Sequence, residues 1–123
     1  MARLPTILLV EDDAGTRALM VTWLDSEGYE VRTACNGREA LMLLEAEAPC
    51  VMVVDLNMPV MDGAELRRRQ LQMPSVSHIP FVLVSAAHDA PCIARDLQID
   101  DVFPKPLDAD RLLRILDSHC HRH

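Results

Sequence analysis

Four positions in this chain carry side chains that could together perform phosphoryl transfer. Asp55 ends the apolar run 50–54 and begins a loop punctuated by proline and glycine. Acids at 11–13 follow a second apolar run, Ser85 follows a third, and Lys105 lies between two prolines after a fourth. Because ligands bind at the carboxyl ends of parallel strands in open α/β sheets, we expect these groups to meet at one edge of a sheet.

The acidic residues of this group predict a magnesium site. Carboxylates held close together raise one another's pKa unless a cation lies between them. Mg²⁺ takes a few oxygen ligands and keeps waters that a phosphate can replace. We expect Asp12 and Asp55 as direct ligands, the backbone carbonyl of Asn57 as a third, and Glu11 acting mainly through water. Asp13 is expected to cap the following helix, where a negative charge suits the helix dipole.

The chemistry expected of this cluster is formation of an acyl phosphate on Asp55. A carboxylate that attacks phosphorus gives this type of covalent intermediate. Phosphoryl transfer depends mostly on positioning and on neutralising charge, which Lys105 and Mg²⁺ would do for the phosphoryl oxygens. The hydroxyl of Ser85 would then donate a hydrogen bond to the bound phosphoryl group.

The periodicity of the chain predicts five strands that alternate with five helices. The first helix is expected to bury Leu19, Met20, Trp23 and Leu24 and to end at Gly28. Asp108 is a plausible N-cap for the last helix. The expected strands are 7–10, 30–34, 50–54, 81–84 and 101–103, and the expected helices are 14–27, 37–48, 64–72, 91–97 and one after Asp108.

Five strand–helix units in a row predict an α/β fold with a doubly wound, five-stranded parallel sheet and helices on both faces. The 123 residues are enough for a single domain with a real core. We expect that core over about 6–118, a flexible tail at 119–123, and no output domain.

Composition narrows the classes of partner. The net charge of −7 argues against a direct nucleic-acid partner. No apolar run is long enough to span a membrane, and no segment is typical of a signal peptide, so we expect a cytoplasmic protein without membrane insertion. The basic run Arg67–Arg69 is interpreted as a solvated helix face, with a docking patch as the alternative.

The cysteines and the histidine-rich end are interpreted as structural features rather than as a metal site. Cys35, Cys50, Cys92 and Cys120 lack any Cys-x-x-Cys pairing, and we expect buried, reduced thiols. The tail 119–123 contains histidines and a cysteine, but its spacing does not make a four-ligand metal site within the chain.

Taken together, these residues resemble the receiver domains of two-component response regulators, above all those that stand alone as chemotaxis regulators do. The resemblance runs from about Thr6 to Leu116. The residues that carry it are Val10-Glu11-Asp12-Asp13, Asp55 with Met58-Pro59 and Asp62-Gly63, Ser85-Ala86, and Lys105-Pro106.

The resemblance implies the flavodoxin-like (βα)5 fold and a signalling role rather than a conventional enzyme activity. It implies that Asp55 takes a phosphoryl group from a phosphohistidine on a sensor histidine kinase or a histidine phosphotransfer protein. Ser85 and Lys105 would then shift, and the surface around the fourth helix, fifth strand and fifth helix would change its affinity for an unidentified target protein or for a second copy of the chain. Lys105-Pro106 resembles the family's cis proline.

Some positions depart from the family pattern. Val102 lies where the family usually has an aromatic residue that couples to Ser85, and Phe103 follows it. The stretch between Ser85 and Lys105 is shorter than usual, which predicts a short fourth helix and an altered signalling face. This keeps open a receiver-like adaptor that works without phosphorylation. A small-molecule phosphatase is disfavoured, because Asn57 replaces the second acid that such enzymes carry.

Overall fold

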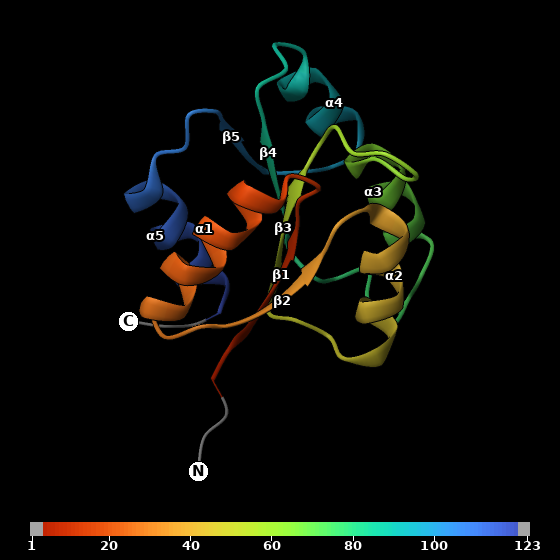
Figure 1. The fold of residues 1–123 in the computed structure, drawn as a ribbon. Helices are drawn as coiled ribbons and strands as arrows, with labels where there is room; N and C mark the ends of the chain where they lie inside the picture. The colour runs from red at the N-terminus through yellow and green to blue at the C-terminus, as the bar shows by residue number, and fades with distance from the viewer. Residues whose placement is uncertain (1–3, 121–123) are drawn as a thin grey trace.

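Five parallel strands form one sheet in the order β2-β1-β3-β4-β5 in this computed structural model, which describes residues 4–120. The predicted doubly wound α/β fold is therefore confirmed (Figure 1). Strands β1, β3 and β4 are buried along most of their length, as expected of strands covered on both faces. The strands are β1 Thr6–Val10, β2 Glu30–Ala34, β3 Val51–Asp55, β4 Phe81–Ser85 and β5 Asp101–Pro104.

The helices cover the sheet in two layers, and each layer closes its own core. Helices α1 (Ala14–Ser26) and α5 (Ala109–His119) lie on one face, and α2 (Gly37–Ala46) and α3 (Gly63–Leu71) lie on the other (Figure 1). The short α4 (Ala90–Asp96) packs into the core of the α2 and α3 side. Successive strand residues point alternately into the two cores, because side chains of a strand alternate between its faces.

Four helices, α1, α2, α3 and α5, start at residues whose side chains cap them. Two of these caps, Asp13 and Asp108, were predicted from the sequence. The carboxylates of Asp13 and Asp108 accept hydrogen bonds from backbone N–H groups in the first turns of α1 and α5. Asn36 and Asp62 do the same for α2 and α3. Gly28 follows α1 with a φ of 92°, a left-handed conformation that favours glycine. These caps fix where each helix leaves the sheet edge.

Two predictions about helix faces are wrong. Leu19, expected in the core, is 75% exposed, because α1 turns Met20 and Leu24 inward instead. Arg67, expected in a solvated run, is buried under α4, while its neighbours Arg68 and Arg69 are exposed and pair with Glu65. Within residues 4–120, we find no helix long and apolar enough to cross a membrane.

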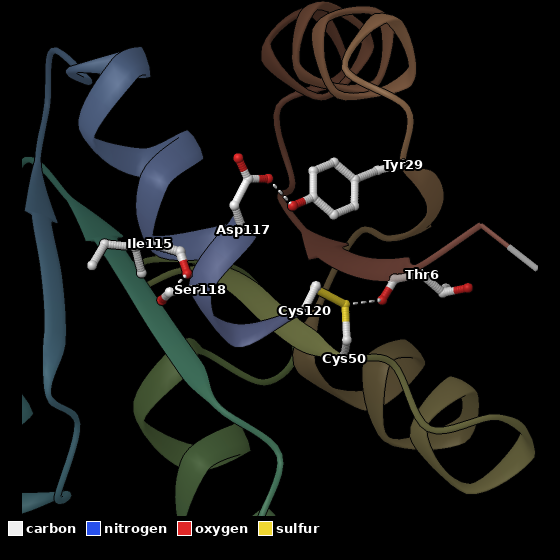
Figure 2. Close-up of a disulfide and its surroundings, with 7 residues drawn as sticks. All are labelled: Thr6, Tyr29, Cys50, Ile115, Asp117, Ser118 and Cys120. Carbon is white, nitrogen blue, oxygen red and sulfur yellow. Dashed lines mark hydrogen bonds between the residues drawn. A yellow bond between two sulfur atoms is a disulfide. The ribbon is translucent and has the colours of Figure 1, made fainter. Parts of the chain in front are cut away.

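The prediction of buried, reduced thiols is wrong for three of the four cysteines: Cys50 and Cys120 are not reduced, and Cys92 is not buried. Cys50 and Cys120 form a disulfide across a sequence separation of 70 residues (Figure 2). Cys35 and Cys92 are free thiols, and Cys92 is exposed. Local spacing could not reveal the pair, because it forms only where the start of β3 meets the end of α5.

The predicted tail at 119–123 is partly held in the fold. Helix α5 reaches His119, whose ring Nε2 lies 2.8 Å from a carboxylate oxygen of Asp101. Cys120 follows directly and is tied to Cys50. The remaining residues of the predicted tail, 121–123, lie outside the described part of the chain.

Candidate functional site

Asp55, Glu11 and Lys105 come together at the carboxyl edge of the sheet. The Nζ of Lys105 lies 3.4 Å from Oδ2 of Asp55 and 3.6 Å from Oε1 of Glu11. The carboxylate oxygens of Glu11, Asp12 and Asp55 lie within 4.8 Å of one another. Strands β1 and β3 are neighbours in parallel register, which is why acids that follow one and end the other converge here.

Glu11 is the buried member of the cluster. The residue is 4% exposed, and burial raises the pKa of its carboxyl above the ordinary value. The hydrogen bond from the Asp13 N–H opposes this rise in pKa, the negative charge of Asp55 adds to it, and the charge of Lys105 opposes it again. Asp12, by contrast, is exposed and free to contact solvent ions.

This donor set fits a hard divalent cation. Three carboxylates share a small volume, and only part of their charge is offset by the nearby ammonium of Lys105. Oxygen-only ligands of this kind suit Mg²⁺, which binds through one or two carboxylates and retains several waters. Asn57 lies exposed two residues beyond the end of β3, and the part expected of its carbonyl stays a prediction.

Ser85 and Lys105 are placed by the pairing of β4 with β5. Ser85 is 2% exposed at the end of β4, and its backbone carbonyl accepts a hydrogen bond from the Lys105 N–H at 3.2 Å. Its Oγ accepts a second hydrogen bond from the Ala87 N–H at 3.0 Å. A hydroxyl that accepts a hydrogen bond still has its own O–H to donate.

Two positioning contacts escaped the sequence analysis. The Nη1 of Arg17 on α1 donates to the backbone carbonyl of Glu11 at 2.8 Å, which holds the acidic loop in place. Gly63 lies so close to β3 that an added Cβ would be 2.7 Å from the backbone oxygen of Asp55. Arg17 gives no local signal, and the motif Asp62-Gly63 does not reveal the close approach of Gly63 to β3, since only the fold creates these contacts.

A cavity of about 200 Å³ opens beside the cluster, between α1 and the segment that leads into α5. Glu11, Asp55 and Lys105 supply its polar wall, and Met20 and Leu107 are among its apolar lining residues.

Valine occupies position 102, where the family usually has an aromatic residue that couples to Ser85. Val102 is half-buried and packs on the α2 and α3 side of the sheet. Phe103 is 3% exposed in the other core, with the guanidinium carbon of Arg111 5.5 Å from its ring centroid. Phe103 therefore cannot substitute for an aromatic side chain at 102, because adjacent residues of a strand face opposite sides.

Sequence comparison places this arrangement among known proteins. Residues 7–117 match the family described as "Response regulator receiver domain". The chain is 38% identical to an uncharacterized 14.6 kDa protein of Leptolyngbya boryana, over 93% of this chain and 88% of that protein. It is 32% identical to the transcriptional regulatory protein AfsQ1 of Streptomyces coelicolor, over 94% of this chain but only 49% of the regulator. The chain thus spans about half the length of that regulator.

Solved structures agree with this assignment. The chemotaxis protein CheY4 of Vibrio cholerae superposes with a TM-score of 0.85 at 26% identity, covering 94% of this chain and 98% of that one. A response regulator of Chloroflexus aurantiacus gives a TM-score of 0.88 at 27% identity, covering 98% of this chain and all of that one.

Proposed function

Given that the chain belongs to the response regulator receiver domain family, we propose that Asp55 is its phosphoryl acceptor. The observation that carries the proposal is the position of Asp55 at the end of β3, with the Lys105 ammonium at 3.4 Å and two further carboxylates beside it. Receiver domains of this family act as signalling phosphoacceptors in two-component systems, and their partners are histidine kinases or phosphotransfer proteins.

In the proposed reaction, a carboxylate oxygen of Asp55 attacks the phosphorus of a phosphohistidine. The new bond is P–O, the P–N bond breaks, and its electron pair stays on the imidazole nitrogen. The cavity that Asp55 lines is the proposed approach of the donor imidazole. Lys105 offsets the negative charge of the phosphoryl oxygens, since phosphoryl transfer depends mostly on positioning and electrostatics. The hydroxyl of Ser85 then donates a hydrogen bond to one of those oxygens.

Glu11, Asp12, Asp55 and the Asn57 carbonyl are the proposed magnesium ligands, with Glu11 acting mainly through water. When bound, Mg²⁺ supplies positive charge that offsets the carboxylates and the phosphoryl oxygens. Arg17 and Gly63 keep the two acidic segments at the required separation. The proposed partners are a sensor kinase or phosphotransfer protein and one unidentified target, with the cytoplasm as the proposed location.

Acetyl phosphate tests the acceptor directly. The full chain is incubated with acetyl phosphate and Mg²⁺, and intact mass is compared for wild type, Asp55→Asn and Asp25→Asn, a change at an exposed aspartate of α1. We expect wild type and Asp25→Asn to gain one phosphoryl group only when Mg²⁺ is present, and Asp55→Asn to gain none. If wild type gains none, and a beryllofluoride mimic also fails to bind, the chain is a phosphorylation-independent adaptor.

We propose that the conformational change after phosphorylation differs from that of receivers that have an aromatic residue at the position of Val102. Val102 offers a smaller side chain, and the short α4 leaves a smaller surface to move. Amide chemical shifts with and without beryllofluoride test this. We expect the largest changes around Ser85 and Lys105, and the usual changes centred on Val102 and α4 would contradict the proposal.

A further inference from the structure

A disulfide joins the sheet to the end of α5 on the side opposite the acidic cluster. Cys50 lies directly before β3, whose last residue is Asp55, so the disulfide and the acceptor lie at opposite ends of one strand. Cys120 is the C-cap of α5. Figure 2 shows the bond closing the gap between these two elements.

We propose that Cys50 and Cys120 are a reversible thiol–disulfide pair that controls how firmly the last turn of α5 is held to the sheet. The oxidant is a small disulfide of the glutathione class. One cysteine thiolate attacks it to give a mixed disulfide and one small thiol; the second cysteine then displaces the other small thiol. Overall, two protein thiols and one small disulfide become one protein disulfide and two small thiols, and reduction reverses both steps.

The bond is accessible to a small thiol. Both cysteines are partly exposed, and a groove of about 400 Å³ runs beside Cys50. Cys50 itself lines this groove, together with Pro49, His78, Pro80, Ser118 and His119. Exchange requires a thiolate to reach one sulfur atom, so access of this kind separates a reactive disulfide from a sealed one.

The structure also accommodates the reduced form. The Sγ of Cys50 lies 3.2 Å from the backbone oxygen of Thr6. A disulfide sulfur has no proton to donate, but a Cys50 thiol would find this acceptor already in place. The backbone N–H of Cys50 donates to the same oxygen at 2.9 Å, so the start of β3 stays fixed in either state.

Reduction therefore acts on α5 rather than on the sheet. Among the described residues, two polar contacts also hold the end of α5: the Tyr29 hydroxyl donates to Asp117, and His119 contacts Asp101 (Figure 2 shows the first). These contacts keep the helix docked when the disulfide opens, while Cys120 is freed. Because α5 begins shortly after Lys105, the helix is linked to the acidic cluster at one end and to the redox pair at the other.

The two remaining cysteines provide internal controls. The Sγ of Cys35 donates to a carboxylate oxygen of Glu39 at 3.0 Å, and this hydrogen bond raises the pKa of the Cys35 thiol. The raised pKa lowers the thiolate fraction of Cys35 and makes it a weaker nucleophile. Cys92 is exposed on α4, away from the pair.

Thiol counting in glutathione buffers tests reversibility. The folded full chain is equilibrated from mainly reduced to mainly oxidised glutathione, quenched in acid, denatured and alkylated without reductant. Among the four cysteines, we expect alkylation to fall from all four to Cys35 and Cys92 as the buffer becomes oxidising, and to recover on return. Cys92→Ser should keep this transition, and in Cys120→Ser any protection of Cys50 should appear in the intact mass as a glutathione adduct rather than as an internal disulfide. Peptide mapping should join Cys50 to Cys120.

Two results would overturn the proposal at this stage. If Cys50 and Cys120 are alkylated even in the most oxidising buffer, the pair does not form. If they stay protected in the most reducing buffer while the protein is folded, the bond is a permanent structural link.

Hydrogen exchange tests the effect on α5. We expect the Cys120 amide, which donates to the Leu116 carbonyl at 2.9 Å, to exchange about tenfold faster after reduction. Cys120→Ser should show the fast rate in both buffers, and Cys92→Ser should behave as wild type. Equal rates in the reduced and oxidised protein would contradict control of α5. The inference is independent of phosphorylation at Asp55.

Discussion

Gly63 packs so closely against β3 that it leaves no room for a side chain. A Cβ here would lie 2.7 Å from the backbone oxygen of Asp55 and 3.1 Å from the Cα of Leu56, so the strand end would have to move. We expect Gly63→Ala to lower the free energy of unfolding by roughly 1–3 kcal/mol. Phosphorylation of Asp55 by acetyl phosphate should slow as well. Urea denaturation followed by circular dichroism measures the first effect, and intact mass over time the second.

Gly15 provides the matched control. It lies in the first turn of α1, and the nearest atom to an added Cβ is a carboxylate oxygen of Asp13 at 3.5 Å, an ordinary contact. Since alanine is a better helix former than glycine, Gly15→Ala should raise the free energy of unfolding by roughly 0.5–1 kcal/mol. If both alanine variants changed stability in the same direction, the close approach at Gly63 would not be the cause.

Val60, in the loop after β3, adopts a left-handed backbone conformation. Its φ is 69°, and its side chain is 76% exposed. A β-branched residue is strained in this region, whereas asparagine tolerates it. Val60→Asn should therefore raise the free energy of unfolding by about 1 kcal/mol in urea denaturation. Val60→Thr keeps the branch at Cβ and should not raise the free energy of unfolding. If threonine raised it as much as asparagine, the cause would be the loss of exposed apolar surface rather than relief of backbone strain.

Helix α4 is held at its C-terminal end by a buried arginine of α3. The Arg67 guanidinium donates to the carbonyls of Leu97 and Gln98 at 3.0 and 2.8 Å and to the Gln70 side chain at 2.8 Å. Loss of these hydrogen bonds would leave buried acceptors unpaired. We expect Arg67→Ala to lower the free energy of unfolding by roughly 3 kcal/mol.

Arg68→Ala is the comparison, because Arg68 is an exposed neighbour on the same helix. Removing its surface pair with Glu65 should change the free energy of unfolding by less than about 0.5 kcal/mol. Denaturation of both variants in guanidinium chloride measures the free energy of unfolding and so distinguishes the roles of the two arginines. A small loss for Arg67→Ala, similar to that for Arg68→Ala, would mean that α4 is held by its apolar contacts alone.

The elements could be predicted from the sequence where the signal is local. Apolar runs, caps such as Asp13 and the breaker Gly28 located strands and helix ends to within about two residues. The order of the strands then brought Asp55 and Lys105 to one edge. The burial of Arg67 and the exposure of Leu19 were missed, since the periodicity of a helix does not fix how it is rotated against its neighbours. The Cys50–Cys120 pair was missed because it depends on a contact between distant elements.

The molecule as a whole is acidic, and several of its negative charges lie together at one site. The chain carries a net charge of −7, and three of its carboxylates share one small site. Mutual repulsion there opposes folding, and Lys105, the only lysine of the chain, offsets part of it. A divalent cation that binds this site in the folded state alone would stabilise the fold by mass action.

Magnesium should therefore raise the thermal stability of the protein. At a free Mg²⁺ concentration about tenfold above its dissociation constant, the free energy of unfolding should rise by about 1.4 kcal/mol. For a domain of this size, the Tm should rise by about 5 °C. Calorimetry at constant ionic strength, with and without Mg²⁺, measures the shift, and a chelator should reverse it. Asp12→Asn, a change at the exposed member of the cluster that leaves the buried Glu11 in place, should lose the shift, and Asp25→Asn should keep it. A shift that survives in Asp12→Asn would place the ion elsewhere.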